Sequence, residues 1–185
     1  MATNILIVTG TAITLADTTD YAPTAARTLG TRTDQIDVTS LAAAAARQST
    51  KIDFTATRAQ LYGVTMNFEL DADPTAGGSV DVYLCPSHSG TANVGNIAYT
   101  TGADAAYVGI SGLTLAELYP HMQVVGKAAA GVQSDGDGIQ SVFLGLFAPT
   151  HRYGNVVVVN STDATFMDDA DEFALSFQPI ITQAQ

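Results

Sequence analysis

Two neighbouring segments of this chain lack a polar face, and this constrains the fold more than any other feature of the sequence. Residues 139–148 (IQSVFLGLFA) and 155–160 (NVVVVN) are both predicted to be β-strands, joined by a short turn. In the first segment large apolar residues occupy both faces, with Val142, Leu144 and Leu146 on one and Phe143 and Phe147 on the other. In the second, four successive valines favour an extended chain and leave no side for water.

Both faces of these strands must be covered. The core of a single β-sandwich covers only one face of each of its sheets. The second face must therefore meet a loop, an arm of the same chain or another subunit. This requirement favours a protein that works in an assembly.

Other segments show the alternation of half-buried strands, and together they predict an all-β fold. The clearest are residues 62–70, 79–85 and 172–180, and the link 71–78 (DADPTAGG) between the first two has the proline and paired glycines of a hairpin loop. Residues 113–119 (LTLAELY) are the one helical turn expected, with Pro120 ending it. The predicted core is Val64, Met66, Phe68, Val80, Val82, Leu84, Val142, Leu144, Leu146, Phe173, Leu175 and Phe177.

The sequence predicts one domain preceded by an extended arm. With 185 residues the chain fits a single antiparallel β-sandwich, jelly-roll-like, with about eight strands. Residues 1–40 differ from the rest because residues 16–40 are rich in Thr, Asp and Ala and hold few large apolar groups. We therefore expect an N-terminal arm over residues 1–40 that contacts a neighbouring subunit, and a sandwich over residues 41–185. The rival arrangement adds the strand-like residues 5–8 to the sheet of their own chain.

Charge and cysteine content exclude several classes of protein. The formal net charge is −11 with a pI near 4.2, so a nucleic-acid or anionic-membrane surface is not expected. The single cysteine, Cys85, cannot form an intrachain disulfide. The first ten residues lack the basic segment and long apolar run of a signal peptide, so synthesis in a cytoplasm is expected.

No motif for catalysis or for binding a cofactor or metal is present. His88, His121 and His151 stand far apart in the sequence without partners at zinc-ligand spacing. No nucleophile elbow or phosphate-binding glycine loop occurs, and Cys85 lies in an apolar strand where a thiol is inert. We therefore expect no catalytic residue, no cofactor and no metal site, so the chain is not expected to be an enzyme.

Two weaker possibilities remain open at this stage. Acidic residues in turns could hold calcium, although the DGDG run is only a fragment of a calcium loop and turn formation explains it better. These residues are Asp71, Asp73, Asp135, Asp137, Asp168, Asp169, Asp171 and Glu172. Polar loops could also bind carbohydrate: the chain has no tryptophan, but seven tyrosines can supply a stacking surface.

Five segments resemble a family of small structural proteins of tailed bacteriophages, whose role is often unassigned. The likeness covers residues 41–182 in order, is structural in character and marks no site. The segments are residues 46–62 (ARQSTKIDFTATRAQLY), 79–92 (SVDVYLCPSHSGTA), 102–112 (GADAAYVGISG), 147–162 (FAPTHRYGNVVVVNST) and 171–180 (DEFALSFQPI). The resemblance implies a virion component without enzymatic activity.

These observations combine into one expected function. We expect a capsid decoration or cement protein on the outside of a phage head, where it joins neighbouring subunits of the major capsid protein and associates with itself, as a homotrimer. The first alternative is a receptor- or glycan-binding module, and the second is a structural protein of the neck or tail. A hydrolase is the most distant reading.

Overall fold

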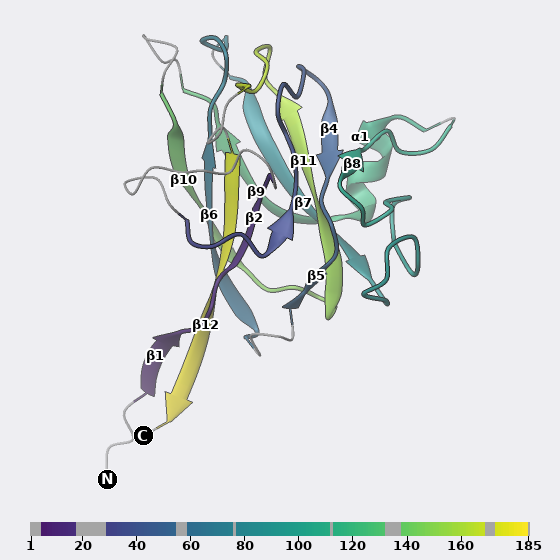
Figure 1. Ribbon diagram of the computed structural model, residues 1–185. Helices are drawn as coiled ribbons and strands as arrows, with labels where there is room; N and C mark the ends of the chain where they lie inside the picture. The colour runs from purple at the N-terminus through teal and green to yellow at the C-terminus, as the bar shows by residue number, and fades with distance from the viewer. Residues whose placement is uncertain are drawn as a thin grey trace.

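The computed structural model shows an all-β sandwich of two sheets, as expected from the sequence (Figure 1). The structure describes residues 5–17, 29–54, 59–75, 77–111, 113–131, 138–168 and 173–184. In this part of the chain there are 12 strands, more than the eight predicted, because several are only two or three residues long.

The first sheet, which we call sheet A, has the strand order β10-β6-β12-β2-β3, with β1 paired to the far end of β12. All of its pairs are antiparallel except β2 with β3. Its strands are β1 (Ile5–Thr9), β2 (Ile13–Ala16), β3 (Asp34–Gln35), β6 (Leu61–Phe68), β10 (Gln140–Phe147) and β12 (Phe173–Ala184).

The second sheet, sheet B, has the order β8-β4-β11-β7-β9, with β5 also paired to β11. Its central strand is the predicted all-valine segment. Its strands are β4 (Ala46–Gln48), β5 (Ile52–Asp53), β7 (Ser79–Ser87), β8 (Ala105–Ala106), β9 (Gln123–Ala129) and β11 (Tyr153–Ser161).

The main core lies between the two sheets and contains most of the residues predicted for it. Nine of the twelve are buried: Val64, Met66, Phe68, Val80, Val82, Leu84, Phe173, Leu175 and Phe177. Val142 and Leu144 are partly buried and pack against this core. Of the predicted core residues, Leu146 lies on the wrong face, since it is 62% exposed, and Phe147, which was expected on the opposite face, is buried in the core.

A β-bulge in β10 explains the error at Leu146. Phe143 lies opposite Thr65 and Gly145 lies opposite Val64, so Leu144 is an extra residue in the strand. Gly145 has φ +123°, a conformation that glycine adopts readily. Beyond the bulge the alternation is reversed, which places Phe147 in the core and Leu146 outside.

The link 71–78 is not a hairpin loop, in contrast to the prediction. β6 pairs with β10 and β12, whereas β7 pairs with β11 and β9, so the two strands that this link joins belong to different sheets. The backbone N–H of Asp71 donates to the carbonyl of Thr165 (2.9 Å), and that of Thr75 to the Asp163 carboxylate (2.7 Å). The link thus runs beside the connection from β11 to β12, which also changes sheets. Turn residues alone could not distinguish a crossing from a hairpin.

Both faces of β11 are covered, as the sequence requires. Val156 and Val158 point into the main core, and Val157 and Val159 belong to a second apolar cluster on the outer face of sheet B. This second cluster is closed by residues of the same chain, among them Tyr107, Leu118 and Met122. We call residues 96–122, which supply most of this lid, the cover segment.

The predicted helical turn lies within the cover segment. Helix α1 (Leu115–Leu118) begins after Thr114, whose side chain forms a capping box with Glu117. A 3-10 helix, η2 (Tyr119–His121), follows and contains Pro120, which therefore ends the α-helical turn but not the helical path of the chain. The Tyr119 ring stacks on Tyr83 of β7 at a centroid distance of 4.9 Å. This stacking packs the helical turn against sheet B.

The described part of residues 1–40 belongs to the sandwich and not to a separate arm. Within their described part, Ile13 and Leu15 of β2 and the following Ile36 and Val38 are buried in the main core. Strand β1 pairs antiparallel with the C-terminal half of β12 in its own chain, which is the rival arrangement. The scattered apolar residues of this region contribute to the sandwich because they lie next to a sheet formed by later strands.

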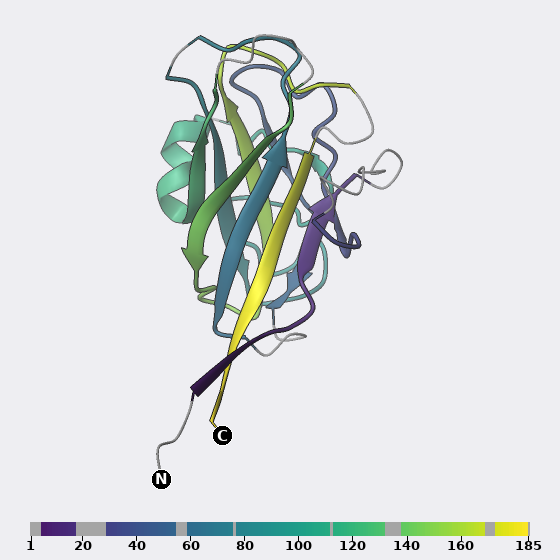
Figure 2. The same cartoon turned by 90° about the vertical axis from the view of Figure 1, so that its left-hand side faces the viewer.

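Strand β1 and the end of β12 form a two-stranded ribbon that projects beyond the sandwich (Figures 1 and 2). Strand β12 pairs with β6 only as far as Ile180, where it lies opposite Leu61. From there to Ala184 its described partner is β1. Neither residues 5–9 nor residues 180–184 include a charged residue. We call these two stretches the terminal ribbon.

Candidate interaction surface

The outer face of β10 exposes two large apolar side chains. Phe143 is 63% exposed and Leu146 is 62% exposed, one on each side of the bulge. Leu146 lies opposite Gly63 of β6, and a methyl group placed on Gly63 would lie 3.6 Å from Cε2 of Phe143. The glycine therefore leaves the aromatic ring and the leucine standing above the neighbouring strand. We call Phe143 and Leu146 the β10 patch.

The β10 patch differs from the equivalent face of β11. Both strands have apolar residues on two faces, but the outer face of β11 is covered by the cover segment. Figure 2 faces the outer side of sheet A and shows β10, β6 and β12 side by side there. Single exposed apolar residues are common on protein surfaces, whereas two large ones on one face of a strand make that face a candidate for contact with a partner.

The terminal ribbon lies at the same end of the sandwich as Leu146. Phe147, the last residue of β10, is opposite Tyr62, and Tyr62 is opposite Pro179 on its other side. The ribbon starts at the next residue, Ile180. The β10 patch and an uncharged projecting ribbon are therefore neighbouring features of one end of the molecule.

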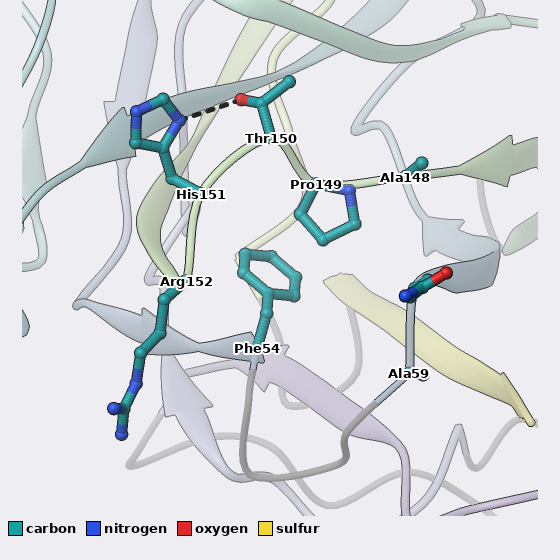
Figure 3. A pocket seen from close by; sticks show the side chains of 8 residues that line it. Phe54, Ala59, Ala148, Pro149, Thr150, His151 and Arg152 are labelled. Atoms are coloured by element: carbon teal, nitrogen blue, oxygen red, sulfur yellow. Dashed lines mark hydrogen bonds between the residues drawn. The ribbon is translucent and has the colours of Figure 1, made fainter.

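The turn between β10 and β11 forms a pocket of about 620 Å³ at this end (Figure 3). Its apolar wall includes Phe54 and Pro149. Its polar groups include Thr150, His151 and Arg152; the Thr150 hydroxyl lies 3.0 Å from Nδ1 of His151, and Arg152 pairs with Asp53 at 2.9 Å. The residues that line it include no carboxylate or thiol. The one hydroxyl–imidazole pair of this lining, Thr150 with His151, is exposed, and the lining supplies no carboxylate to orient the imidazole.

The structure brings together two of the three histidines. The rings of His88 and His151 are in edge-to-face contact, with centroids 5.0 Å apart, although the residues are distant in sequence. His121 lies elsewhere, at a pocket in the cover segment. Within the described ranges no three or more His, Cys, Asp or Glu side chains gather where they could bind a metal ion.

Cys85 is buried in the second apolar cluster, as its apolar strand predicts. Burial raises the pKa of its thiol to about 12, so the thiolate is not formed near neutral pH. Lys51 donates hydrogen bonds to Ser87 and to Asn96, and burial lowers the pKa of its ammonium group. These bonds join Lys51 to the end of β7 and to the first residue of the cover segment. The contacts of Cys85 and Lys51 are therefore those of residues that stabilise the fold.

The acidic residues considered for calcium are only partly described. Asp71 accepts a hydrogen bond from the backbone N–H of Thr165 (3.0 Å), which is a turn contact. Asp135 and Asp137, together with Asp169, Asp171 and Glu172, lie outside the described residues. Hydrogen bonds from Thr75 lower the pKa of Asp163, so this carboxylate stabilises the link between the sheets.

Comparison with protein-family models, curated proteins and solved structures finds no match. No helix in the part of the chain that the structure describes is long and apolar enough to cross a membrane.

Sequence reasoning missed the β10 patch as a surface feature. Strict alternation placed Leu146 in the core and Phe143 on the opposite face, so the two did not appear as a pair. The available signal was Gly145, because a glycine inside an apolar strand often marks a bulge.

Proposed function

We propose that this protein is a structural component of a tailed-phage virion, a decoration or cement protein that binds the outside of the head. The observation that supports this most is the β10 patch. Strand β10 has apolar residues on both faces, and its outer face is exposed, so it is available for contact with another protein. The sequence resemblance to phage structural proteins supports the class of assembly. The protein would be made in the host cytoplasm and act on the capsid surface, without enzymatic activity.

The proposed mechanism is binding to the assembled shell and not to free capsid subunits. The β10 patch and the terminal ribbon lie at one end of the molecule, so both can contact the major capsid protein together. The ribbon offers backbone N–H and carbonyl groups along its edges, which can pair with an extended segment of a neighbour. A ligand that binds only the assembled state stabilises that state by mass action.

Self-association is part of the proposal, with a homotrimer as the expected form. Closed cyclic symmetry suits a protein placed at a rotation axis of a shell, and such interfaces are more apolar than ordinary surface. An uncharged patch and an uncharged ribbon meet this requirement in a protein whose net charge is −11.

Rebinding of purified protein to phage heads that lack it tests the proposal. The double variant Phe143→Ser/Leu146→Ser should keep the melting temperature and lose binding to heads. The matched control is Val108→Ser in the cover segment, which alters a residue that is 78% exposed on the outer side of sheet B and should leave binding intact. Equal binding by the double variant and the wild type would show that the β10 patch is not the contact surface.

A reconstruction of the virion tests where the protein lies in the particle. Density in many copies on the head surface is the expected result. A few copies at the neck or tail would replace decoration by the alternative structural role. Complete absence from the particle would overturn the proposed function.

A further inference from the structure

The cover segment contains a strained turn that presents an aromatic side chain to solvent. Ala98 and Tyr99 have φ values of +54° and +58°, so two successive residues with side chains adopt the left-handed conformation. Such conformations are unfavourable for residues other than glycine and persist only where the surroundings hold them. The Tyr99 side chain is 57% exposed, so burial of its ring does not account for the strain.

Hydrogen bonds from buried and partly buried groups hold the backbone of this turn in place. The hydroxyl of Tyr107, a residue that is only 2% exposed, donates to the Ala98 carbonyl at 2.7 Å. The Asn96 amide donates to the Thr100 carbonyl at 2.8 Å, and the Thr100 hydroxyl donates to the buried side chain of Asn155 at 3.0 Å. These hydrogen bonds fix the backbone on both sides of Tyr99, so the position of its ring is well defined. A ligand that stacks on it would meet a surface that is already ordered.

The ring borders a pocket of about 320 Å³. The pocket is lined by Asn96, Ala98, Tyr99, Leu113 and His121. Among the described residues, no hydrogen bond engages the Tyr99 hydroxyl or the His121 imidazole. Apart from this imidazole the lining has no titratable group other than the tyrosine. The site thus combines an exposed aromatic face, an apolar wall at Leu113 and two available polar groups.

We propose that this pocket binds the ring of a neutral saccharide, an activity separate from attachment to the head. A pyranose has an apolar C–H face that can stack on Tyr99 and hydroxyl groups that can bond to the Tyr99 hydroxyl and His121. An anionic ligand is disfavoured by the net charge of −11, and a cationic one by the lack of a carboxylate in the lining. A protein partner needs a contact area far larger than this pocket offers.

Saturation-transfer NMR with the full-length protein tests the proposal. The probes are the methyl pyranosides of glucose, galactose, mannose and N-acetylglucosamine. At least one should receive saturation on its ring protons, and Tyr99→Gly should weaken its binding about two- to tenfold, as loss of an aromatic contact predicts. The control Val108→Ser changes another exposed residue of the cover segment that does not line the pocket, and it should bind as the wild type does.

Tyr99→Gly also separates binding from a structural role. Glycine adopts positive φ without strain, so relief of strain offsets the greater freedom of the unfolded chain and the melting temperature should be kept. A marked fall in melting temperature would show that Tyr99 serves folding instead. Failure of all four glycosides to receive saturation, or binding that Tyr99→Gly leaves unchanged, would overturn the proposal. Neither result depends on where the protein sits in a virion.

Discussion

Adjacent residues of β10 have opposite environments because of one inserted residue. Phe147 is buried against Phe177 in the main core, whereas Leu146 is exposed beside Gly63. Strict alternation from Val142 gives the reverse assignment. The bulge at Leu144 therefore decides which of two apolar side chains stabilises the fold and which is free to bind a partner.

The bulge makes a prediction about two alanine variants. Phe147→Ala should lower the free energy of unfolding by about 3–5 kcal/mol, since it removes a buried aromatic ring from the core. Leu146→Ala should change it by about 0.5 kcal/mol or less, as is usual for an exposed position. Denaturant unfolding of the two variants measures both values. A larger loss for Leu146→Ala than for Phe147→Ala would contradict the bulge.

Two buried tyrosines, Tyr83 and Tyr107, and the partly buried Tyr119 predict a loss of stability at high pH. Burial raises the pKa of Tyr119 to about 12 and also raises the pKa values of Tyr83 and Tyr107. Between the ordinary tyrosine pKa of 10.0 and about 12, the folded state binds more protons than the unfolded state. The stabilisation is therefore fully present below pH 10 and is lost as the pH rises through this window.

Unfolding by denaturant at about pH 9 and about pH 11 measures this loss. The free energy of unfolding should be lower at the higher pH, and Tyr119→Phe should reduce the difference because one titrating group is removed. Tyr153, on β11 outside the second cluster, gives the matched control Tyr153→Phe. An identical pH dependence in Tyr119→Phe and in the wild type would show that Tyr119 does not contribute.

At the scale of elements, strands could be predicted but their sheets could not. The alternation in residues 62–70 and 79–85 locates β6 and β7 and their inward faces correctly. Alternation does not say whether the following turn returns to the same sheet, so the link 71–78 was assigned wrongly. The covering of Val157 and Val159 was foreseen as a need, but the sequence left open whether a loop, an arm or a partner meets it.

The N-terminal region shows the same limit. Its few apolar residues gave no reason to place it in the core, because the sheet that receives Leu15 is formed by residues more than 150 positions later, such as Leu175. Left-handed backbone at Ala98 and Tyr99 has no signal in the sequence, since glycine or asparagine would be expected there.

Truncation of the N-terminus should give two different outcomes. Deletion of residues 1–10 removes β1 but leaves every described residue of the main core, so the melting temperature should be nearly unchanged. Deletion of residues 1–40 also removes Ile13, Leu15, Ile36 and Val38, each of which contributes roughly 1.5–3 kcal/mol on burial. Their sum is comparable with a typical stability of about 5–15 kcal/mol, so this variant should unfold.

Thermal unfolding followed by circular dichroism distinguishes the two deletions. The shorter deletion should also weaken binding to phage heads, because the terminal ribbon loses one of its strands. A folded protein after removal of residues 1–40 would mean that β2 is dispensable. Unfolding after removal of residues 1–10 would mean that the ribbon is part of the cooperative unit.

For the whole molecule, the net charge opposes self-association and the proposed apolar contact surface favours it. A net charge of −11 on a 19.2 kDa protein makes copies repel one another. The β10 patch and the terminal ribbon contribute no charged residue to an interface. Self-association through these surfaces would therefore gain from apolar burial and lose from long-range repulsion.

This balance predicts that salt strengthens self-association. Raising the ionic strength from about 0.01 M to about 0.15 M shortens the Debye length from about 30 Å to about 8 Å, which screens the repulsion and leaves apolar burial unaffected. Sedimentation velocity at the two ionic strengths should show a shift from the monomer mass of 19.2 kDa towards the oligomer. The Phe143→Ser/Leu146→Ser variant should remain monomeric at both. Dissociation on adding salt would instead indicate an interface held by ion pairs, and a monomer under both conditions would exclude the trimer, because apolar association no longer opposed by charge should then have been visible.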